Sequence, residues 1–221
     1  SYPWMAVTGT RLFGLKGLAV DRLYREDDFN ILVDANGNKT YTLREGVVHS
    51  EMLPNPMPGD ILYVDQNGDG VVDTNYDAVQ DYVHPTVPEI MYGFGINATY
   101  KGIYVSLFFQ GAGNTSLNLN NQPHLFQPFS EAIYNSSVRQ EIIESRWTEA
   151  NPSQDVFFPR ISLKSKTNTN STLNSWFFRD ASYLRLKTVE LGYTIPEKIA
   201  AKVLMKQARI YVMGQNVALL Y

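Results

Sequence analysis

Apolar and polar residues alternate along the stretch from Tyr92 to Gly111 more regularly than anywhere else in the chain. The positions in between carry mostly small, polar or charged residues. A repeat of two residues is typical of a strand with two different faces, so the sequence predicts two strands, over 92–100 and 103–111. The apolar set is Tyr92, Phe94, Ile96, Ala98 and Tyr100, then Ile103, Val105, Leu107 and Phe109.

A two-residue turn at Lys101-Gly102 would pair these strands as a hairpin in one well-specified register. Tyr100 then lies opposite Ile103, and the other apolar residues of the two strands also pair on that face. A shift by one residue would destroy this match. Each strand has nine residues, close to the roughly 9–11 that a tilted strand needs to cross a bilayer. The pattern fits a hairpin of an outer-membrane barrel, and also a hairpin of a soluble β-sandwich.

The remaining periodic segments are mostly strand-like, which makes the expected fold class all-β and antiparallel. Between Leu186 and Val189 the apolar positions change parity, so either a bulge lies near Lys187-Thr188 or Leu184 and Leu186 face inward. Short helical segments are expected at 26–28, 136–147 and 196–206. Strands are expected over 29–33, 39–43, 181–195 and 208–214.

The chain divides by composition into three regions. Residues 1–57 form a strand and loop region, and residues 58–87 contain a loop rich in Asp, Asn and Gly. Residues 88–221 carry the barrel-like hairpins, interrupted by a long polar tract over 112–180. Tracts this long are unusual inside compact soluble domains, whereas long external loops are expected in outer-membrane barrels. The apolar run at the last residues suggests a chain truncated at both ends.

Composition narrows the classes of function. The chain has 221 residues, a net charge of −3 and no cysteine. The small net charge gives no support for nucleic-acid binding, and the absence of cysteine excludes disulfides and thiolate metal sites. Charged residues make up 19%, below the roughly 25% of an average soluble domain. No apolar run reaches the roughly 20 residues of a transmembrane helix.

Acidic and amide side chains at 65–77 have the spacing of a calcium-binding loop. Three oxygen-bearing side chains at alternate positions are followed by Gly70, as at the start of such a loop. The twelfth position is Tyr76 instead of an acidic residue, and Asp77 comes one residue later. The alternative is an Asx-rich turn without a metal. The expected calcium ligands are Asp65, Asn67, Asp69, the carbonyl of Val71, Asp73 and Asp77.

Other candidate sites have weaker support. Glu141 and Glu144 lie in a helical segment with nothing to align them on a substrate, so no enzymatic activity is expected. The three histidines, His49, His84 and His124, are too far apart in sequence to suggest zinc. Arg185 and Lys187 are expected to be paired or to face a lumen.

Four aromatic residues fit either a structural or a binding role. They are expected mainly to pack loops together, although they could also stack on sugar rings or lie at a membrane interface. They are Trp147, Trp176, Phe177 and Phe178.

Several segments together resemble the C-terminal part of the SusC/RagA family of TonB-dependent outer-membrane transporters of Bacteroidetes. The segment GLKGLAVDRLYREDDF (14–29) is a looser match. The segments occur in the family's order and cover about residues 58–220. They are PGDILYVDQNGDGVVD (58–73), PEIMYGFGINATYKGIYVSLFFQG (88–111), RWTEANP (146–152) with FPRI (158–161), ASYLRLKTVELGYTIP (181–196) and ARIYVMGQNVALL (208–220).

The resemblance implies a fragment of a plugged barrel of roughly 22 strands. Members of the family import glycans or peptides, energised by TonB, beneath a SusD-like surface lipoprotein. The expected location is therefore the outer membrane, with lipid against the apolar strand faces and TonB bound by a part of the protein outside this chain. The alternative is a secreted, calcium-binding β-rich module that binds glycan or protein. That module would bury the same apolar faces against a second sheet.

Overall fold

The computed structural model describes residues 3–121, 128, 138–161 and 174–221. The chain separates into two compact units. We call Ser1–His84 with Leu117–Arg179 the discontinuous unit, and Pro85–Ser116 with Asp180–Tyr221 the sheet unit.

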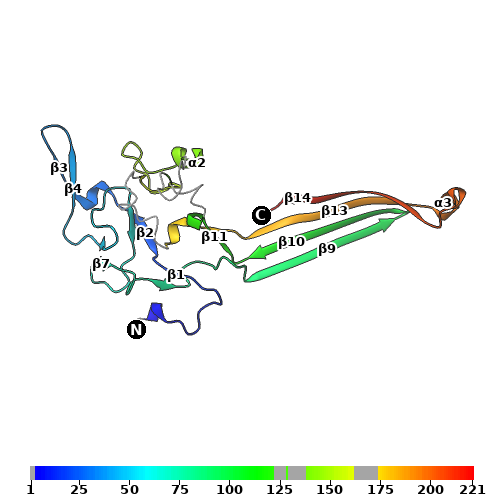
Figure 1. The fold of residues 1–221 in the computed structure, drawn as a ribbon, viewed down its shortest axis with the longest axis horizontal. Helices are drawn as coiled ribbons and strands as arrows, with labels where there is room; N and C mark the ends of the chain where they lie inside the picture. Colours follow the sequence, from blue (N-terminus) through cyan, green and yellow to red (C-terminus); the bar gives the residue numbers. More distant parts are fainter. Residues whose placement is uncertain (1–2, 122–127, 129–137, 162–173) are drawn as a thin grey trace. The chain divides into compact units, whose positions relative to one another are not determined.

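The sheet unit is built on one four-stranded antiparallel sheet with the strand order β14-β13-β10-β9. Figure 1 shows these strands running side by side. The all-β prediction is confirmed. Three of the strands are longer than the sequence pattern indicated, whereas β13 begins two residues after the predicted start at 181. They are β9 (Ile90–Tyr100), β10 (Ile103–Gly113), β13 (Tyr183–Ile195) and β14 (Ala208–Leu219).

The β9–β10 hairpin has the predicted register. Tyr100 lies opposite Ile103, and Phe94 lies opposite Phe109. The turn residues Lys101 and Gly102 have φ angles of 50° and 90°. Positive φ at both central residues is the requirement of a type I′ turn, whose twist matches that of the flanking strands. The turn and the alternation of side chains therefore specify the same pairing.

The change of parity in β13 is a bulge, as one of the two sequence interpretations proposed. Phe108 pairs with Thr188 while Phe109 pairs with Leu186, so Lys187 has no partner in β10. The extra residue moves Leu186 onto the face that already carries Val189. The bulge therefore keeps one apolar face continuous along the whole of β13.

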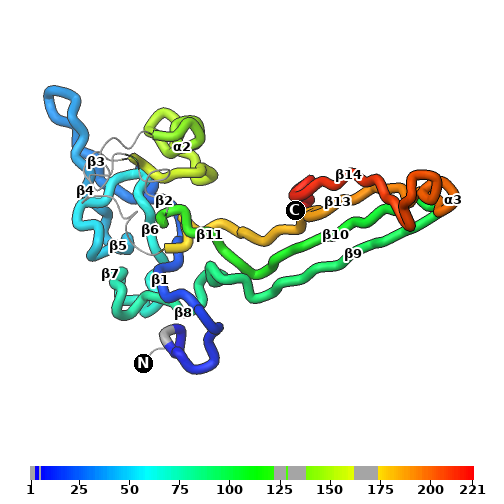
Figure 2. Tube along the Cα trace, turned by 45° about the vertical axis from the view of Figure 1, so that its right-hand side comes forward, coloured from blue at the N-terminus to red at the C-terminus, as the bar shows by residue number. Residues whose placement is uncertain are grey.

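A short helical connector joins β13 to β14. It comprises α3 (Glu197–Ala200) and η7 (Ala201–Val203), as predicted for 196–206. Leu204 ends it in the left-handed region with φ 59°. The connector and the β9–β10 turn lie at the same end of the sheet (Figures 1 and 2).

The discontinuous unit consists of short elements. The hairpin of β3 (Phe29–Val33) and β4 (Lys39–Leu43) has the predicted bounds, and Asp34 caps its turn by accepting hydrogen bonds from the N–H groups of Asn36 and Asn38. The other strands are β1 (Lys16–Gly17) with β8 (Val79–Gln80), β2 (Val20–Leu23) with β6 (Ile61–Tyr63), β5 (His49–Ser50) with β7 (Val71–Val72), and β11 (Ser116–Asn118) with β12 (Phe178–Asp180).

Helical elements in this unit are one or two turns long. The predicted helix at 136–147 is shorter in the structure: α2 covers Gln140–Glu144, and residues 136–137 lie outside the described residues. Within α2, Ile142 is buried whereas Ile143 is 53% exposed. The 3-10 helices are η1 (Pro3–Met5), η2 (Glu26–Asp28), η3 (Leu119–Asn121) and η6 (Ser175–Phe177).

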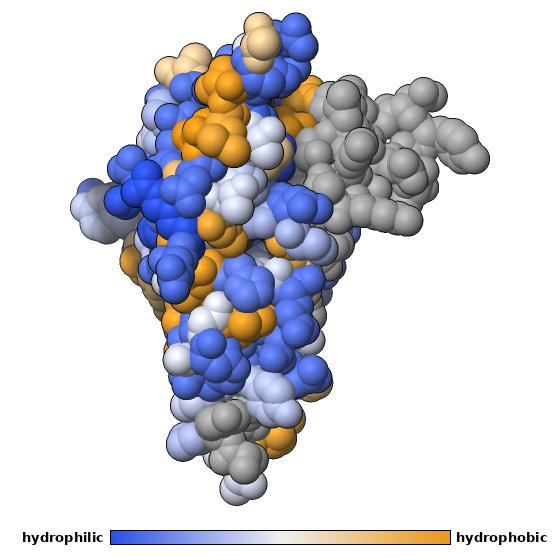
Figure 3. Space-filling view, turned by 90° about the vertical axis from the view of Figure 1, so that its left-hand side faces the viewer, coloured by the Kyte–Doolittle hydropathy of each residue, from blue (hydrophilic) through white to orange (hydrophobic). Residues whose placement is uncertain are grey.

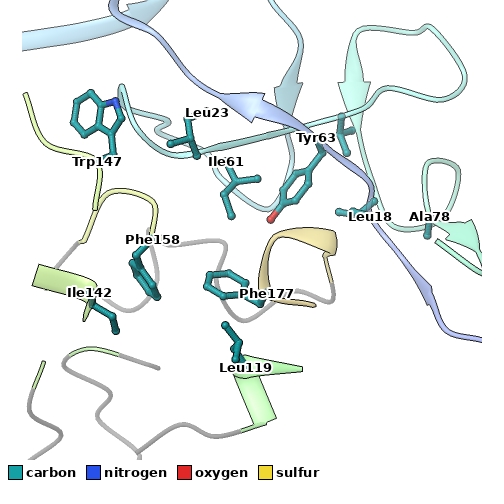
Figure 4. Close-up of a cluster of buried hydrophobic side chains, with 11 residues drawn as sticks. Leu18, Leu23, Ile61, Tyr63, Ala78, Leu119, Ile142, Trp147, Phe158 and Phe177 are labelled. Atoms are coloured by element: carbon teal, nitrogen blue, oxygen red, sulfur yellow. The ribbon is translucent and has the colours of Figure 1, made fainter. Parts of the chain in front are cut away.

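The core of the discontinuous unit combines segments that are far apart in sequence. Leu23, Ile61 and Tyr63 from its first part lie with Phe158 and Phe177 from its second part (Figure 4). A second cluster contains Tyr24, Phe29, Leu53 and Leu62. The described part of 112–180, expected to be a long loop, therefore contributes to a hydrophobic core.

The four aromatic residues considered for stacking on sugars pack within this unit. Trp147, Phe177 and Phe178 are buried, and Trp176 packs partly buried against the main cluster. Phe158 and Phe177 meet edge to face with ring centroids 5.6 Å apart. The expected packing role is thus confirmed. Residues 162–173 of the predicted polar tract 112–180 lie outside the described residues.

A buried ion pair joins the two parts of the discontinuous unit. The Nε and Nη2 groups of Arg160 each donate a hydrogen bond of 2.9 Å to the carboxylate of Asp60. The backbone N–H of Met57 donates to the same carboxylate. Burial raises the pKa of Asp60, although Arg160 acts in the opposite direction. The pair stabilises the packing of segments 100 residues apart.

Replacing Arg160 with Met should destabilise this unit strongly, because the Asp60 carboxylate would stay buried without its partner. The expected loss is about 3–5 kcal/mol in the free energy of unfolding at neutral pH. Chemical denaturation followed by tryptophan fluorescence would measure it. Removing the exposed Arg139–Glu141 pair with Arg139→Met should cost less than about 1 kcal/mol.

The same variant should regain stability on acidification. A folded-state pKa above the unfolded value means that the folded state binds the proton more tightly. The deficit of Arg160→Met relative to the wild type should therefore shrink as the pH falls through the raised pKa of Asp60. A deficit that stays constant between pH 7 and pH 4 would contradict the assignment of the loss to a buried charge.

Candidate functional site

One face of the four-stranded sheet is apolar across every strand. Residues paired across the sheet fall into rows, and each row takes one side chain from each of β9, β10, β13 and β14. The four rows are Tyr100, Ile103, Tyr193 and Ile210; Ala98, Val105, Leu191 and Val212; Ile96, Leu107, Val189 and Gly214; and Phe94, Phe109, Leu186 and Ala218.

This apolar face is exposed. Ile96 is 55% exposed, Leu191 53% and Val212 75%. Stacking between the rings of Phe94 and Phe109, with centroids 4.8 Å apart, covers only part of each ring. Large continuous apolar surfaces on a protein mark an interaction with a partner or a membrane.

The opposite face carries a polar network. The hydroxyl group of Tyr104 donates a 2.6 Å hydrogen bond to Glu190. The guanidinium of Arg209 lies over the ring of Tyr104 at 5.6 Å. Arg185 donates to the side chain of Gln110 at 3.0 Å. The partner of Arg185 in this contact is a neutral amide and not an opposite charge. This face can contact water or polar solutes.

The surface of the discontinuous unit has a different character. On the face shown in Figure 3, hydrophilic residues surround smaller groups of hydrophobic ones. Within the described residues, no helix is long and apolar enough to span a membrane.

The loop at 65–77 is organised by side-chain oxygens that accept backbone N–H groups. Asp65 accepts from Gly68 and from Gly70, each at 2.7 Å. Asp69 accepts from the N–H of Val71 at 2.8 Å and from the amide of Asn67. These contacts turn the first three expected ligands into one tight loop, and Gly68 and Gly70 adopt positive φ within it.

The second half of the loop is closed by Asp77. This residue is fully buried, and its carboxylate oxygens accept the N–H groups of Gln66 and Asp73, each at 2.8 Å. Asp73 in turn accepts from Asn75 and Tyr76. Asp77 was expected as a calcium ligand one residue after the usual twelfth position. In the structure its carboxylate instead accepts the hydrogen bonds that join the two ends of the loop.

The fit of this loop to calcium is partial. Both carboxylate oxygens of Asp65, Asp69 and Asp77 accept one N–H group each, and Oδ1 of Asp73 accepts two. An ionised carboxylate offers about four acceptor positions in total. Among the residues described, no group of three or more acidic or histidine side chains is arranged to hold a metal ion. The residues that would hold calcium are Asp65, Asn67, Asp69, Val71 through its carbonyl, and Asp73.

The remaining candidates are dispersed. His49 lies in β5, His84 contacts Arg11 with its Nδ1 2.6 Å from the guanidinium, and His124 lies outside the described residues. Glu141 is paired with Arg139, which lowers the pKa of that carboxyl to about 2. A carboxyl with so low a pKa is unsuited to act as a general acid.

Sequence reasoning missed the contacts between distant polar residues. The Asp60–Arg160 and Tyr104–Glu190 pairs join residues 100 and 86 positions apart. No local pattern marks such pairs. The only sequence signal was the occurrence of both Asp60 and Arg160 within the segments that resemble the transporter family.

Comparison with known proteins links the sheet and the loop to one group of receptors. TonB-dependent receptor P26 of Formosa agariphila is 32% identical over 181 residues, which is 81% of this chain and 17% of the relative. TonB-dependent receptor P3 of the same organism is 30% identical over 72% of this chain and 14% of its own length. This chain thus spans about a sixth of these relatives. No family model matches.

Solved structures agree on the fold. A chain of the RagAB peptide importer in its open-open state matches 74% of this chain and 17% of its own length, with a TM-score of 0.52 and 23% identity. The closed-closed state matches 93% of this chain and 19% of that chain, with a TM-score of 0.53 and 19% identity. The chain therefore belongs to the TonB-dependent receptors of the outer membrane, and its fold matches part of the SusC-like RagA chain of the RagAB importer.

Proposed function

We propose that this chain forms part of the wall of an outer-membrane importer that takes up an oligosaccharide or a peptide with energy from TonB. The observation that carries the proposal is the sheet with one exposed apolar face and one polar face, on a chain related to TonB-dependent receptors. The apolar rows would face lipid and the Tyr104–Glu190 face would line the lumen.

The partners follow from the same assignment. A SusD-like surface lipoprotein would cover the extracellular side, and TonB would bind a segment outside this chain. Support for such pairing is the similarity to a structure described as the RagAB peptide importer. The 32% identical relative is named only as a TonB-dependent receptor, so it does not decide between glycan and peptide.

A secreted calcium-binding module is the second candidate function. That candidate requires the apolar rows to pack against another sheet. Ile96, Leu191 and Val212 are instead each more than half exposed. The importer therefore accounts better for the sheet.

Deletion of the encoding gene should abolish growth on one class of substrate while leaving growth on simple sugars and amino acids intact. The measurement compares wild-type and deletion strains on defined oligosaccharides and on defined peptides as sole carbon source. Uptake of the responsive substrate should also stop when a protonophore collapses the proton gradient. Equal growth of both strains on all oligosaccharides and peptides tested would contradict import.

Charge substitutions on the two faces of β10 should differ in their cost to the stability of the receptor. Leu107→Arg, on the apolar face, should destabilise the membrane-inserted receptor by about 2–4 kcal/mol, because an Arg near the bilayer midplane is costly. Ser106→Arg, one residue away on the polar face, should cost less than about 1 kcal/mol. Urea titration of the full-length receptor folded in lipid vesicles would measure both. Equal costs would contradict a lipid-facing apolar side.

We also propose that the 65–77 loop binds calcium through Asp65, Asn67 and Asp69. Support comes from their alternate spacing and from the tight turn that already gathers their oxygens.

Calcium at millimolar concentration should raise the melting temperature of the receptor relative to the same protein in EGTA, because the ion binds the folded state. Asp69→Ala should remove that difference. Asp34→Ala is the matched control, since Asp34 also caps an Asx-type turn, in the β3–β4 hairpin, and should leave the calcium response intact. An unchanged melting temperature for the wild type would leave the loop as a structural turn only.

A further inference from the structure

The connector between β13 and β14 exposes apolar side chains at one end of the sheet. Leu204 is 98% exposed and Val203 62%, and Ile199 and Met205 are each more than half exposed. Ala200 alone in the connector is buried, and the N–H of Met205 donates to its carbonyl. An exposed apolar group of this size on a short turn indicates contact with a partner or a lipid surface.

Basic residues accompany these apolar ones at regular spacing. Lys198, Lys202 and Lys206 recur every fourth residue, and the only acid in the connector is Glu197. Lys198 and Ile199 lie next to each other in α3, and Lys202 and Val203 in η7, so exposed basic and apolar side chains accompany each other along the connector. Basic amphipathic segments of this kind lie in membrane interfaces.

A cleft joins the connector to the neighbouring turn. It has a volume of about 500 Å³, and its lining includes Lys101 from the β9–β10 turn, Lys206 and Glu197. The N–H of Thr194 donates a 2.7 Å hydrogen bond to the carbonyl of Gly102, which holds the turn against β13. Two lysines from different turns and one acid thus line one open cleft, and its lining has a net positive charge.

The edge of the apolar face adjoins these turns. Its last row contains Tyr100 and Ile103, the residues on either side of the Lys101-Gly102 turn. Tyr193 and Ile210 complete the row and flank the connector on β13 and β14. The exposed apolar surface of the sheet therefore continues in sequence and in space into the basic connector.

We infer that the connector and the Lys101 turn form an interfacial edge that binds the anionic headgroups of phospholipids. Ile199, Val203, Leu204 and Met205 would enter the boundary between headgroups and acyl chains, while the lysines contact phosphate oxygens. The inference rests on the proposed orientation of the apolar face towards lipid. Short turns of outer-membrane barrels lie on the periplasmic side, so the leaflet concerned is the inner one.

Spin labels can measure where the connector lies. A nitroxide at Leu204→Cys, in the full-length receptor reconstituted in vesicles, should be more accessible to oxygen than to a water-soluble nickel complex. A label at Asn36→Cys in the exposed β3–β4 turn should show the reverse. This chain contains no cysteine, and any cysteine elsewhere in the receptor would first be replaced by serine.

A third label keeps this inference separate from the proposed function. Val212→Cys reports on the apolar face itself, where Val212 is 75% exposed. Lipid-like accessibility at Val212 with water-like accessibility at Leu204 would overturn the interfacial edge and leave the barrel wall intact. Water-like accessibility at both would overturn both. A Leu204 label that is immobilised and reached by neither reagent would mean that protein covers the connector, which also overturns the inference.

The headgroup preference gives a second readout. Receptor purified from vesicles that contain phosphatidylglycerol should keep more bound lipid than receptor purified from vesicles of phosphatidylcholine alone. Native mass spectrometry would count the bound lipids. Lys198→Gln with Lys202→Gln should reduce this preference about fivefold for each lysine removed. The matched control, Lys16→Gln with Lys39→Gln, removes two lysines of the discontinuous unit and should leave the preference unchanged. Equal effects of the two pairs would overturn specific headgroup binding.

Discussion

The register of β10 with both of its neighbours is the constraint on which the sheet depends. Side chains alternate strictly along a strand, so a shift of one residue on either side would place half of the apolar residues on the polar face. The type I′ turn sets the pairing with β9, and the bulge at Lys187 adjusts the pairing with β13. Both local features are needed to keep the apolar side chains on one face of the sheet and the polar network on the other.

The parts of the fold that follow from local patterns could be predicted from the sequence. The β9–β10 register and the β3–β4 hairpin each depend on residues within about 20 positions of one another. The bulge at Lys187 was one of two alternatives that the sequence left open, because it is set by pairing with the distant Phe108 and Phe109 of β10. The core of the discontinuous unit could not be predicted in the same way. Phe158 and Phe177 pack against Ile61 and Tyr63 through contacts that no periodicity encodes, and the polar residues around them suggested a loop.

The 65–77 loop illustrates why the candidate site was harder to interpret than the fold. An Asx-rich turn and a calcium loop use the same residue types, because both need oxygen atoms directed at the centre of a tight bend. Asp65 and Asp69 point their oxygens at backbone N–H groups that keep the bend closed. Spacing alone identifies the residues. How many of their acceptor positions bind backbone N–H groups, and how many are left for an ion, depends on the three-dimensional loop.

The discontinuity of the first unit has a consequence for the order in which the protein is made. Residues 1–84 emerge first, yet Leu18, Ile61 and Tyr63 obtain their aromatic partners only after Phe158 and Phe177 have been synthesised. During that interval the chain also produces the β9–β10 hairpin, whose apolar rows are exposed on the described chain. Both surfaces are prone to aggregate while they wait. Apolar surface therefore stays uncovered for longer than in a chain in which each unit is continuous.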